Sequence, residues 1–568
     1  MRNARPAPQQ PSGMPFAKYR PFLDIVSIDL PDRTWPDNRI TTAPRWLSTD
    51  LRDGNQSLIE PMGPQAKRAI FDLLVNMGFK EIEIGFPAAS QTDFDFVRSL
   101  VDDGAIPEDV TISVLTQSRG ELIDRTLDAC IGIPRATVHL YNALSPLFRN
   151  VVFRMDRDQI RELAVDGTRQ IMARAEKVLD EDTIFGFEYS PEIFVDTELE
   201  YSLEVCRAVM DAWEPEGDRE IILNLPATVE RATPNIYADQ IEWMSRHLPR
   251  RESVCLSLHT HNDRGCAVAA SELAVMAGAD RVEGTLLGNG ERTGNMDIMI
   301  MAMNLYSQGI DPGLDFSRMN DIVHIVSECN NLPVHPRHPY IGELVFTAFS
   351  GSHQDAIKKS LEKDSGGIWD IAYLPIDPLD IGRSYQDVVR INSQSGKGGV
   401  AYILARDYGL NVPRWLQIDF AQKVQAESER TQKELTSQDI IALFEARYLH
   451  DSPLHLDDYT LRRQGQHDHL EATLHDPHGN PIHIGGNGSG AMSAFINALQ
   501  THTGLAISVA NYAEHAMSKS TDAQAVAYVQ LMIDDHLHTG IAYSQDTVSA
   551  MLRATLVAIG QAGSEKAA

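Results

Sequence analysis

Residues 254–263 read VCLSLHTHND, an apolar run of strand length that ends in a cluster of polar side chains. A short apolar run with this kind of boundary is typical of a strand buried in a parallel sheet. The sequence contains seven further runs of this kind. Amphipathic segments such as AKRAIFDLLVNMG (66–78) and NIYADQIEWMSRHL (235–248) lie between the runs. Those runs are WLSTDLRD (46–53), EIEIGF (81–86), TISVLT (111–116), ATVHLYNA (136–143), TIFGFEYS (183–190), EIILNLPAT (220–228) and RVEGTLLGNGER (281–292).

Strands that alternate with helices indicate the α/β class with a parallel sheet. Eight such units within roughly 250 residues predict a (β/α)8 TIM barrel. A doubly wound open sheet is the alternative, but no GxGxxG motif follows the first run.

The alternation stops near residue 330. GSHQDAIKKSLEK (351–363) predicts a helix, and the Gly/Ser-rich NSQSGKGG (392–399) is typical of a linker. From about residue 450, three strand-like runs and a helix occur twice, and the loop IGGNGSG (484–490) leads into the first of these helices. We therefore expect an N-terminal arm (1–40), a barrel (41–330), mainly helical linker subdomains (331–445) and a small α+β domain suited to ligand sensing (446–568).

The composition excludes several classes of partner. Lysine and arginine total 50 against 79 aspartates and glutamates, a net charge of -29. Such a chain repels phosphate backbones and anionic membranes, so we expect neither nucleic acid nor a membrane as partner. The five cysteines form no CxxC pair, and the N-terminus lacks the apolar stretch of a secretory signal. Reduced thiols and a cytoplasmic location are predicted.

His259 and His261 stand two residues apart on a predicted strand. With a side-chain period of two, both imidazoles point to the same face, here the barrel interior. Two imidazoles near the C-terminal end of a strand are a metal-ligand arrangement. A pair of polar histidines at the barrel mouth is the alternative, and the spacing alone does not separate the two interpretations.

Other polar residues end the predicted strands, where barrel enzymes carry their chemistry. They are Arg52 and Asp53 after the first run, Glu188 in the fifth, Thr228 in the sixth, and Glu291 and Asn295 after the eighth. Nitrogen and oxygen ligands from Asp53, the two histidines and Asn295 suit Mg²⁺, Mn²⁺ or Zn²⁺ with open coordination positions. A 2-oxo acid could fill those positions, and Arg52 could then stabilise the alkoxide formed on carbon–carbon bond formation.

STDLRDGNQSL, HTHNDRG and GNGERTGN resemble signature segments of the α-isopropylmalate synthases, within the metal-dependent barrel lyases and condensing enzymes. The segments LPDRTWPDNRITTAPRW and GFKEIEIGFPAASQTDFDF resemble the long form found in actinobacteria and fungi. The resemblance runs from about Tyr19 to about Gln561. It implies condensation of acetyl-CoA with 2-oxoisovalerate, the first committed step of leucine biosynthesis, under feedback inhibition by leucine. Homocitrate or citramalate synthesis, and a sensor without catalysis, are the alternatives.

The resemblance also implies roles for individual residues. Asp53, His259, His261 and Asn295 would bind the divalent metal, with Mg²⁺ preferred, while Arg52 stabilises the ketone oxygen and Thr228 binds the substrate carboxylate. Glu188 and Glu291 would belong to the polar network of the site. His353 and Tyr385 would reach the active site of the partner chain, which implies a homodimer. The residue that removes the acetyl-CoA methyl proton is not readable from the sequence, and a relay through His353 is our preference.

The segments NYAEHA (511–516) and AVAYVQL (525–531) match the family's leucine-binding domain. The match implies that Asn511, Tyr512, Ala527 and Tyr528 take part in regulation. The loop IGGNGSG departs from the family's GxGNGP pattern, with Ile484 at the place of the first glycine and Ser489 at the place of the proline. The strength of leucine feedback is therefore not carried over from the family.

Overall fold

The computed structural model describes residues 14–217, 219–348, 350–363, 366–385, 397–431, 435–517 and 523–565. The chain divides into two compact units. The first comprises Met1–Val345 with Asp380–Arg383, and the second comprises Phe346–Leu379 with Ser384–Ala568. None of the helices in these ranges combines the length and apolarity needed to cross a bilayer.

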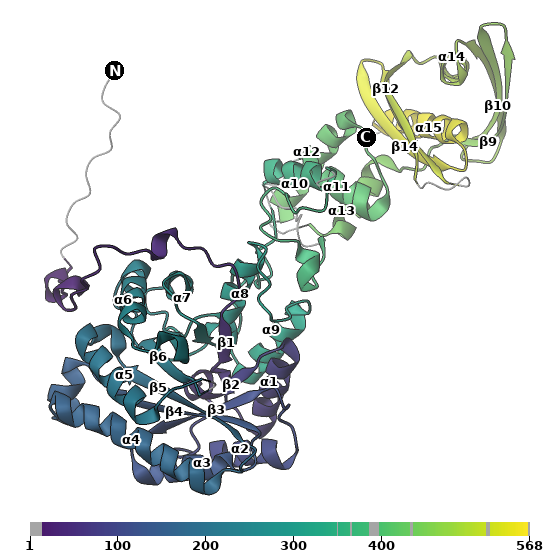
Figure 1. The fold of residues 1–568 in the computed structure, drawn as a ribbon. Coiled ribbons are helices and arrows are strands. Elements are labelled where there is room, and N and C mark those ends of the chain that lie inside the picture. Colours follow the sequence, from purple (N-terminus) through teal and green to yellow (C-terminus); the bar gives the residue numbers. More distant parts are fainter. Residues whose placement is uncertain are drawn as a thin grey trace, which may run out of the picture. The chain divides into compact units, whose positions relative to one another are not determined.

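The first unit is built on a closed barrel of eight parallel strands in the order β1 to β8, with helices around it (Figure 1). Pairing of β8 with β1 closes the barrel, so the prediction of a (β/α)8 fold is confirmed. The strands are β1 Arg45–Ser48, β2 Glu81–Glu83, β3 Thr111–Gln117, β4 Arg135–Ala143, β5 Ile184–Glu192, β6 Ile221–Ala227, β7 Val254–Thr260 and β8 Arg281–Gly284. The helices are α1 Pro64–Met77, α2 Gln91–Asp102, α3 Gly120–Cys130, α4 Arg157–Val178, α5 Leu199–Trp213, α6 Pro234–His247, α7 Ala267–Met276, α8 Ile298–Tyr306 and α9 Met319–Asn330.

Local sequence signals set several helix ends. Pro64 opens α1, where its missing N–H costs no hydrogen bond, and Gly78 closes that helix with φ +102°. Helix α4 begins with a capping box, in which the Asp156 carboxylate accepts from the Gln159 backbone N–H and the Gln159 side chain accepts in return.

Two strand ends differ from those predicted. Strand β1 ends at Ser48, and Asp50–Gly54 form a π-helical turn, η4, that carries Arg52 and Asp53. Strand β5 continues to Glu192 because β4 offers backbone partners as far as Ala143, which pairs with Glu192. Glu188 therefore lies in the middle of β5 and not at its end, which corrects the prediction.

The residues before the barrel are attached to α6. The Arg33 guanidinium donates to both carboxylate oxygens of Asp239, at 2.8 and 2.9 Å. The buried Trp35 donates from Nε1 to the same carboxylate at 2.8 Å, and Thr34 donates from Oγ1 to Glu242 at 2.6 Å. Residues 1–13 of the predicted arm lie outside the described residues.

The second unit begins with helices, which are α10 Gly351–Leu361, α11 Lys397–Tyr408, α12 Arg414–Thr431 and α13 Ser437–Tyr448. The rings of Phe420, Phe444 and Tyr448 pack against one another with centroids 5.1 to 5.9 Å apart, which joins α12 to α13. Within the Gly/Ser-rich segment predicted as a linker, the residues KGG (397–399) form the first turn of α11. The preceding residues 392–396 lie outside the described residues.

An α+β domain completes the second unit, and the predicted double β-β-β-α pattern is confirmed. Two antiparallel three-stranded sheets lie on either side of a layer formed by α14 and α15 (Figure 1), and their inner faces form one apolar core with the helices. The elements are β9 His455–Gln464, β10 His467–His475, β11 Pro481–Gly488, α14 Ala491–Thr503, β12 Ile507–Ala516, β13 Ala525–Ile533, β14 His536–Ser544 and α15 Thr547–Glu565.

The segment IGGNG, predicted as a loop, is the second half of strand β11. Its glycines let α14 approach the strand closely. A Cβ atom on Gly486 would lie 2.3 Å from the Ala494 carbonyl oxygen, and one on Gly488 would lie 2.2 Å from Ser493 Oγ. Only Ser489 and Gly490 remain between the strand and the helix.

Candidate active site

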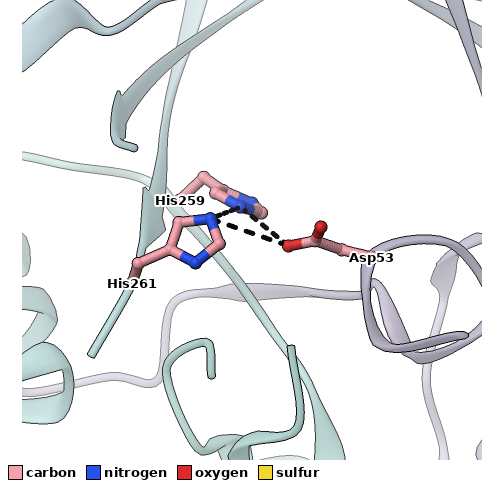
Figure 2. A group of neighbouring side chains, drawn as sticks. All are labelled: Asp53, His259 and His261. Carbon is pink, nitrogen blue, oxygen red and sulfur yellow. Dashed lines mark hydrogen bonds and ion pairs between the residues drawn. The ribbon is translucent and has the colours of Figure 1, made fainter. Parts of the chain in front are cut away.

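Three buried side chains converge at the C-terminal end of the barrel. Strand β7 carries His259, the residue just beyond it is His261, and the turn after β1 carries Asp53. The Nε2 atoms of His259 and His261 lie 3.3 and 3.7 Å from Oδ2 of Asp53, and 3.3 Å from each other (Figure 2). All three side chains are less than a tenth exposed, so the cluster is shielded from bulk water.

Asn295 completes this cluster from the loop after β8. Its backbone pairs with that of His261, and its Nδ2 donates to Asp53 Oδ2 at 2.7 Å. The buried atoms Asn295 Oδ1 and His261 Nδ1 lack a hydrogen-bond partner among the described residues. Two imidazoles, a carboxylate and an amide oxygen offer mixed nitrogen and oxygen ligands, and the group Asp53, His259 and His261 has the spacing to hold a metal ion. The residues present thus fit a divalent cation.

The electrostatics of the cluster keep its carboxylate ionised. Burial opposes the charge on Asp53, but Arg52 and His259 outweigh it and lower the pKa of that carboxyl. Burial also lowers the pKa of His259, yet Asp53 and Glu283 together raise it to about 9. Burial and the neighbouring His259 lower the pKa of His261 to about 3. The ionised Asp53 and the neutral His261 are in the state that a cation needs, whereas His259 gives up its Nε2 proton when a cation binds.

Arg52 extends from the same turn into the barrel mouth. Its Nε donates to Glu83 Oε2 at 2.5 Å, and its Nη1 lies 3.2 Å from Asp53 Oδ1. Burial alone would lower the pKa of the guanidinium, but Glu83 and Asp53 raise it, so Arg52 stays charged. This places a fixed positive charge directly beside the cluster.

A buried polar network fills the barrel interior beneath the cluster, and most of its members were not predicted. His139 accepts or donates at both nitrogens, with Glu83 Oε1 2.7 Å from Nδ1 and Ser190 Oγ 2.7 Å from Nε2. On the opposite side, Glu283 contacts His259 Nδ1 at 3.0 Å. A charged or polar residue inside an apolar run, as in EIEIGF, ATVHLYNA and RVEG, is the sequence signal that could have found them.

Glu188 belongs to this network and does not line the cavity above it. Arg281 Nη2 lies 2.7 Å from Glu188 Oε1, and His139 Nε2 lies 3.6 Å away. Complete burial raises the pKa of Glu188 to about 8. The carboxyl group therefore holds a proton at neutral pH more readily than an exposed glutamate does.

A cavity of about 400 Å³ opens above the cluster. Its walls combine the predicted residues with apolar and aromatic ones, and they are formed by Arg52, Asp53, Gln56, Phe86, Leu115, His139, Tyr141, Ser190, Glu192, Asn224, Pro226, Thr228, His259, His261, Glu291 and Arg292. Thr228 accepts from the Ile193 backbone N–H at 3.0 Å, and Glu291 is exposed at the rim. The volume and mixed lining suit a small organic acid.

Comparisons with known proteins give the family. The HMGL-like family model matches residues 43–326, the model "alpha-isopropylmalate synthase, post-catalytic domain-like" matches 343–405, and the "LeuA allosteric (dimerisation) domain" matches 434–562. The 2-isopropylmalate synthase of Thermobifida fusca (strain YX) is 55% identical over 98% of this chain and 99% of its own. The chain belongs to the 2-isopropylmalate synthase family.

Two further 2-isopropylmalate synthases have similar coverage. That of Parafrankia sp. (strain EAN1pec) is 53% identical over 98% of this chain and 99% of its own. That of Azotobacter vinelandii (strain DJ / ATCC BAA-1303) is 52% identical over 97% and 98%. The resemblance to this synthase family is confirmed, and the activity is 2-isopropylmalate synthesis in leucine biosynthesis, with an allosteric domain after the barrel.

His353 and Tyr385 both fall in the synthase's post-catalytic segment, in the second unit. His353 is exposed on α10, and its ring stacks on Tyr373 with centroids 4.1 Å apart. The Tyr385 hydroxyl donates to Asp377 Oδ1 at 2.9 Å.

The four residues that the resemblance implies for regulation of the synthase lie on adjacent strands with different surroundings. Asn511 and Tyr512 are exposed on β12, where Asn511 donates to Gln530 Oε1 at 2.8 Å. Ala527 and Tyr528 are buried on β13, and since neighbouring residues of a strand face opposite sides, only Ala527 joins the core between the two sheets. Tyr528 stacks instead on His515 with centroids 5.7 Å apart. The four side chains therefore do not share one face of the sheet.

Proposed function

We propose that the chain condenses acetyl-CoA with 2-oxoisovalerate and water to give 2-isopropylmalate and CoA, as a cytoplasmic homodimer inhibited by leucine. The observation that carries the proposal is identity above 50% to 2-isopropylmalate synthases over nearly the full length of both chains. The buried cluster at the C-terminal end of the barrel supplies the chemistry that this reaction requires.

In this proposal Asp53, His259, His261 and Asn295 hold the divalent ion, with Mg²⁺ preferred to Mn²⁺ or Zn²⁺. When bound, the ion acts as a Lewis acid that polarises the ketone of the oxo acid. The support is the unpartnered Asn295 Oδ1, an acceptor buried beside two imidazoles and a carboxylate.

The protein groups around the ion orient the substrate and stabilise charge. Arg52 donates to the ketone oxygen as that oxygen becomes an alkoxide, and Glu83 fixes the direction of its guanidinium. Thr228, on the cavity wall, binds the substrate carboxylate. Glu188 acts from below through Arg281 and His139, while Glu291 belongs to the polar rim.

The reaction needs one base and one water molecule. The base takes a proton from the acetyl-CoA methyl group, whose carbon then forms a bond to the ketone carbon of the oxo acid. The alkoxide takes up a proton, and water cleaves the thioester so that CoA leaves as a thiol. We assign the proton relay to His353 and a supporting role to Tyr385, both supplied by the partner chain. The support is the exposed His353 ring and the match of both residues to the family's post-catalytic segment.

Leucine is the proposed effector, and the allosteric domain its site. Asn511, Tyr512, Ala527 and Tyr528 are the residues proposed to respond to it. The same domain match, whose description names dimerisation, supports the homodimer.

A thiol-release assay with acetyl-CoA and a panel of 2-oxo acids tests the proposal. We expect release of CoA with 2-oxoisovalerate at the highest kcat/KM of the panel, and loss of release after chelation of the metal. A preference for 2-oxoglutarate would indicate homocitrate synthesis, and a preference for pyruvate would indicate citramalate synthesis. If no CoA is released with any of the acids despite bound metal, the chain is a sensor without catalysis.

A further inference from the structure

We infer that Glu283 is a positioning residue for the metal site, and that it orients His259 so that Nε2 faces the cation. The inference rests on the proposed function, since it concerns the same cluster. His259 and Glu283 are direct partners in the register of the adjacent strands β7 and β8. The Oε2 atom of Glu283 lies 3.0 Å from His259 Nδ1, the ring nitrogen that faces away from Asp53.

The Glu283 carboxylate is itself held in place at both oxygens. Arg281 Nη2 contacts Oε1 at 2.6 Å, and Ser257 Oγ donates to the same oxygen at 3.2 Å. Asn224 Nδ2 donates to Oε2 at 3.3 Å. The side chain is fully buried, so water does not compete for these contacts. A carboxylate with this many fixed partners has one orientation.

A neutral imidazole carries its proton on either of two nitrogens. A carboxylate at Nδ1 favours the form with the proton there, which leaves the Nε2 lone pair free for a cation. The same contact also fixes the plane of the ring. His261 differs, since its Nδ1 is buried without a hydrogen-bond partner among the described residues. His259 is therefore the ligand that the protein orients in advance.

Arg281 extends the support to the far end of the barrel. The same Nη2 that contacts Glu283 lies 2.7 Å from Glu188 Oε1, and Nη1 contacts Glu81 Oε2 at 2.9 Å. The guanidinium thus contacts both buried carboxyl groups, and Glu188, whose pKa is raised by burial, also shares a hydrogen bond with Glu283. Glu81 shares Arg281 but lies at the N-terminal end of β2, where its other partner is Arg45. A change at Glu81 therefore weakens the ion pairs of Arg281 but leaves the contact of Glu283 with His259, which makes Glu81 a matched control.

Titration of the full-length protein with Co²⁺ tests the inference, with the visible spectrum of the bound ion as the readout. For Glu283→Gln we expect a Kd ten- to a hundredfold higher than that of the wild type, because loss of such an outer partner usually has this effect. The spectrum of the saturated ion should also change, since the ring is no longer held. Glu81→Gln should lower thermal stability yet keep the wild-type Kd and spectrum.

A Glu283→Gln protein with a Kd within twofold of the wild type and an unchanged spectrum would overturn the inference. If that variant does not fold, Glu283→Asp keeps the charge and shortens the side chain. It should give an intermediate Kd, and a wild-type Kd and spectrum would again overturn the inference. His259→Ala separates this failure from that of the proposed function. If His259→Ala binds Co²⁺ as the wild type does, the metal site itself has been assigned wrongly.

Discussion

The Nε2 atom of His259 lies 3.3 Å from the Nε2 atom of His261. Two protonated nitrogens at this separation would repel, so one of the pair must present a lone pair. The pKa values identify it as His261, lowered to about 3, while the pKa of His259 is raised to about 9. Both rings also face the ionised Asp53 carboxylate. The cluster is thus arranged to exchange a proton for a cation.

Loss of one ligand should remove both the metal and the activity. We expect Asp53→Ala and His261→Ala to abolish CoA release and to lower the bound divalent metal, because both residues face the same position. Metal content per chain after gel filtration and the thiol-release rate measure the two effects. His324→Ala, an exposed histidine on α9, is the control and should change neither. Full activity at unchanged metal content would contradict the assignment.

Arg52→Lys should keep the fold and lose most of kcat. Lysine retains the charge, but its single nitrogen cannot contact Glu83 and a developing alkoxide in the geometry of the guanidinium fork. Loss of one well-placed donor costs about 3–4 kcal/mol, or roughly a hundred- to a thousandfold in kcat. Arg45→Lys, at the opposite end of the barrel, is the matched control. A rate within a few-fold of the wild type would show that Arg52 serves only as a structural charge.

Mixing two inactive variants should restore some activity if linker residues complete the partner's site. We expect His353→Ala chains combined with Arg52→Lys chains to form mixed dimers in which one site keeps both residues. The thiol-release rate after subunit exchange measures the recovery, and each variant treated alone is the control. If exchange is proven by differently tagged chains and no activity returns, each chain completes its own site.

Leucine should inhibit through the C-terminal domain. Deleting the chain from Ser452 removes strands β9 to β14 with their own apolar core, and should abolish leucine sensitivity while some catalysis remains. The deletion also removes the contact of His515 with the Gly409 carbonyl, so a point variant is needed beside it. Tyr512→Ala, at an exposed position of β12, should weaken inhibition without changing kcat. A truncated enzyme that leucine still inhibits would place the effector in the barrel.

Asp50 should make the barrel less stable as the pH rises. Burial raises the pKa of this carboxyl from 3.8 to about 7, even though Ser48 and the Leu286 backbone N–H donate to it. Between pH of about 4 and 7 the unfolded chain releases this proton and the folded chain keeps it. The stability that this group contributes is therefore present below pH of about 4 and is lost as the pH rises to about 7. The free energy of unfolding falls by at most about 1.4 kcal/mol per pH unit in this range.

The variant Asp50→Asn isolates this effect, because the amide does not ionise in this range. We expect the stability of the wild type relative to Asp50→Asn to fall from pH 4 to pH 7 and to level off above it. Urea denaturation at closely spaced pH values measures the difference. Parallel profiles for the two proteins would show that Asp50 is ionised in the fold throughout.

The repeated pattern of short apolar runs and amphipathic segments was enough to predict the barrel, because eight strand–helix units have few other ways to bury their apolar faces. The motif HTHND was enough to bring His259 and His261 to one face, since strand periodicity is a local property. Parallel strands end at the same edge, so Asp53 and Asn295 were both expected near the two histidines. This holds although more than 200 residues separate Asp53 from Asn295.

The support beneath the cluster was decided only by the tertiary structure. Glu83 and His139 are 56 residues apart in the chain, and the sequence around either residue does not identify the other as its partner. The same holds for Glu188 and Arg281, whose contact depends on how far β5 runs and on which residues of β8 point inward. Strand lengths follow from the backbone partners that neighbouring strands offer, and buried charges are paired across the barrel. Sequence by itself determined that Arg52, Asp53, His259, His261 and Asn295 reach the barrel mouth, whereas the closed barrel placed Glu188 below it and decided which buried charges hold the cluster.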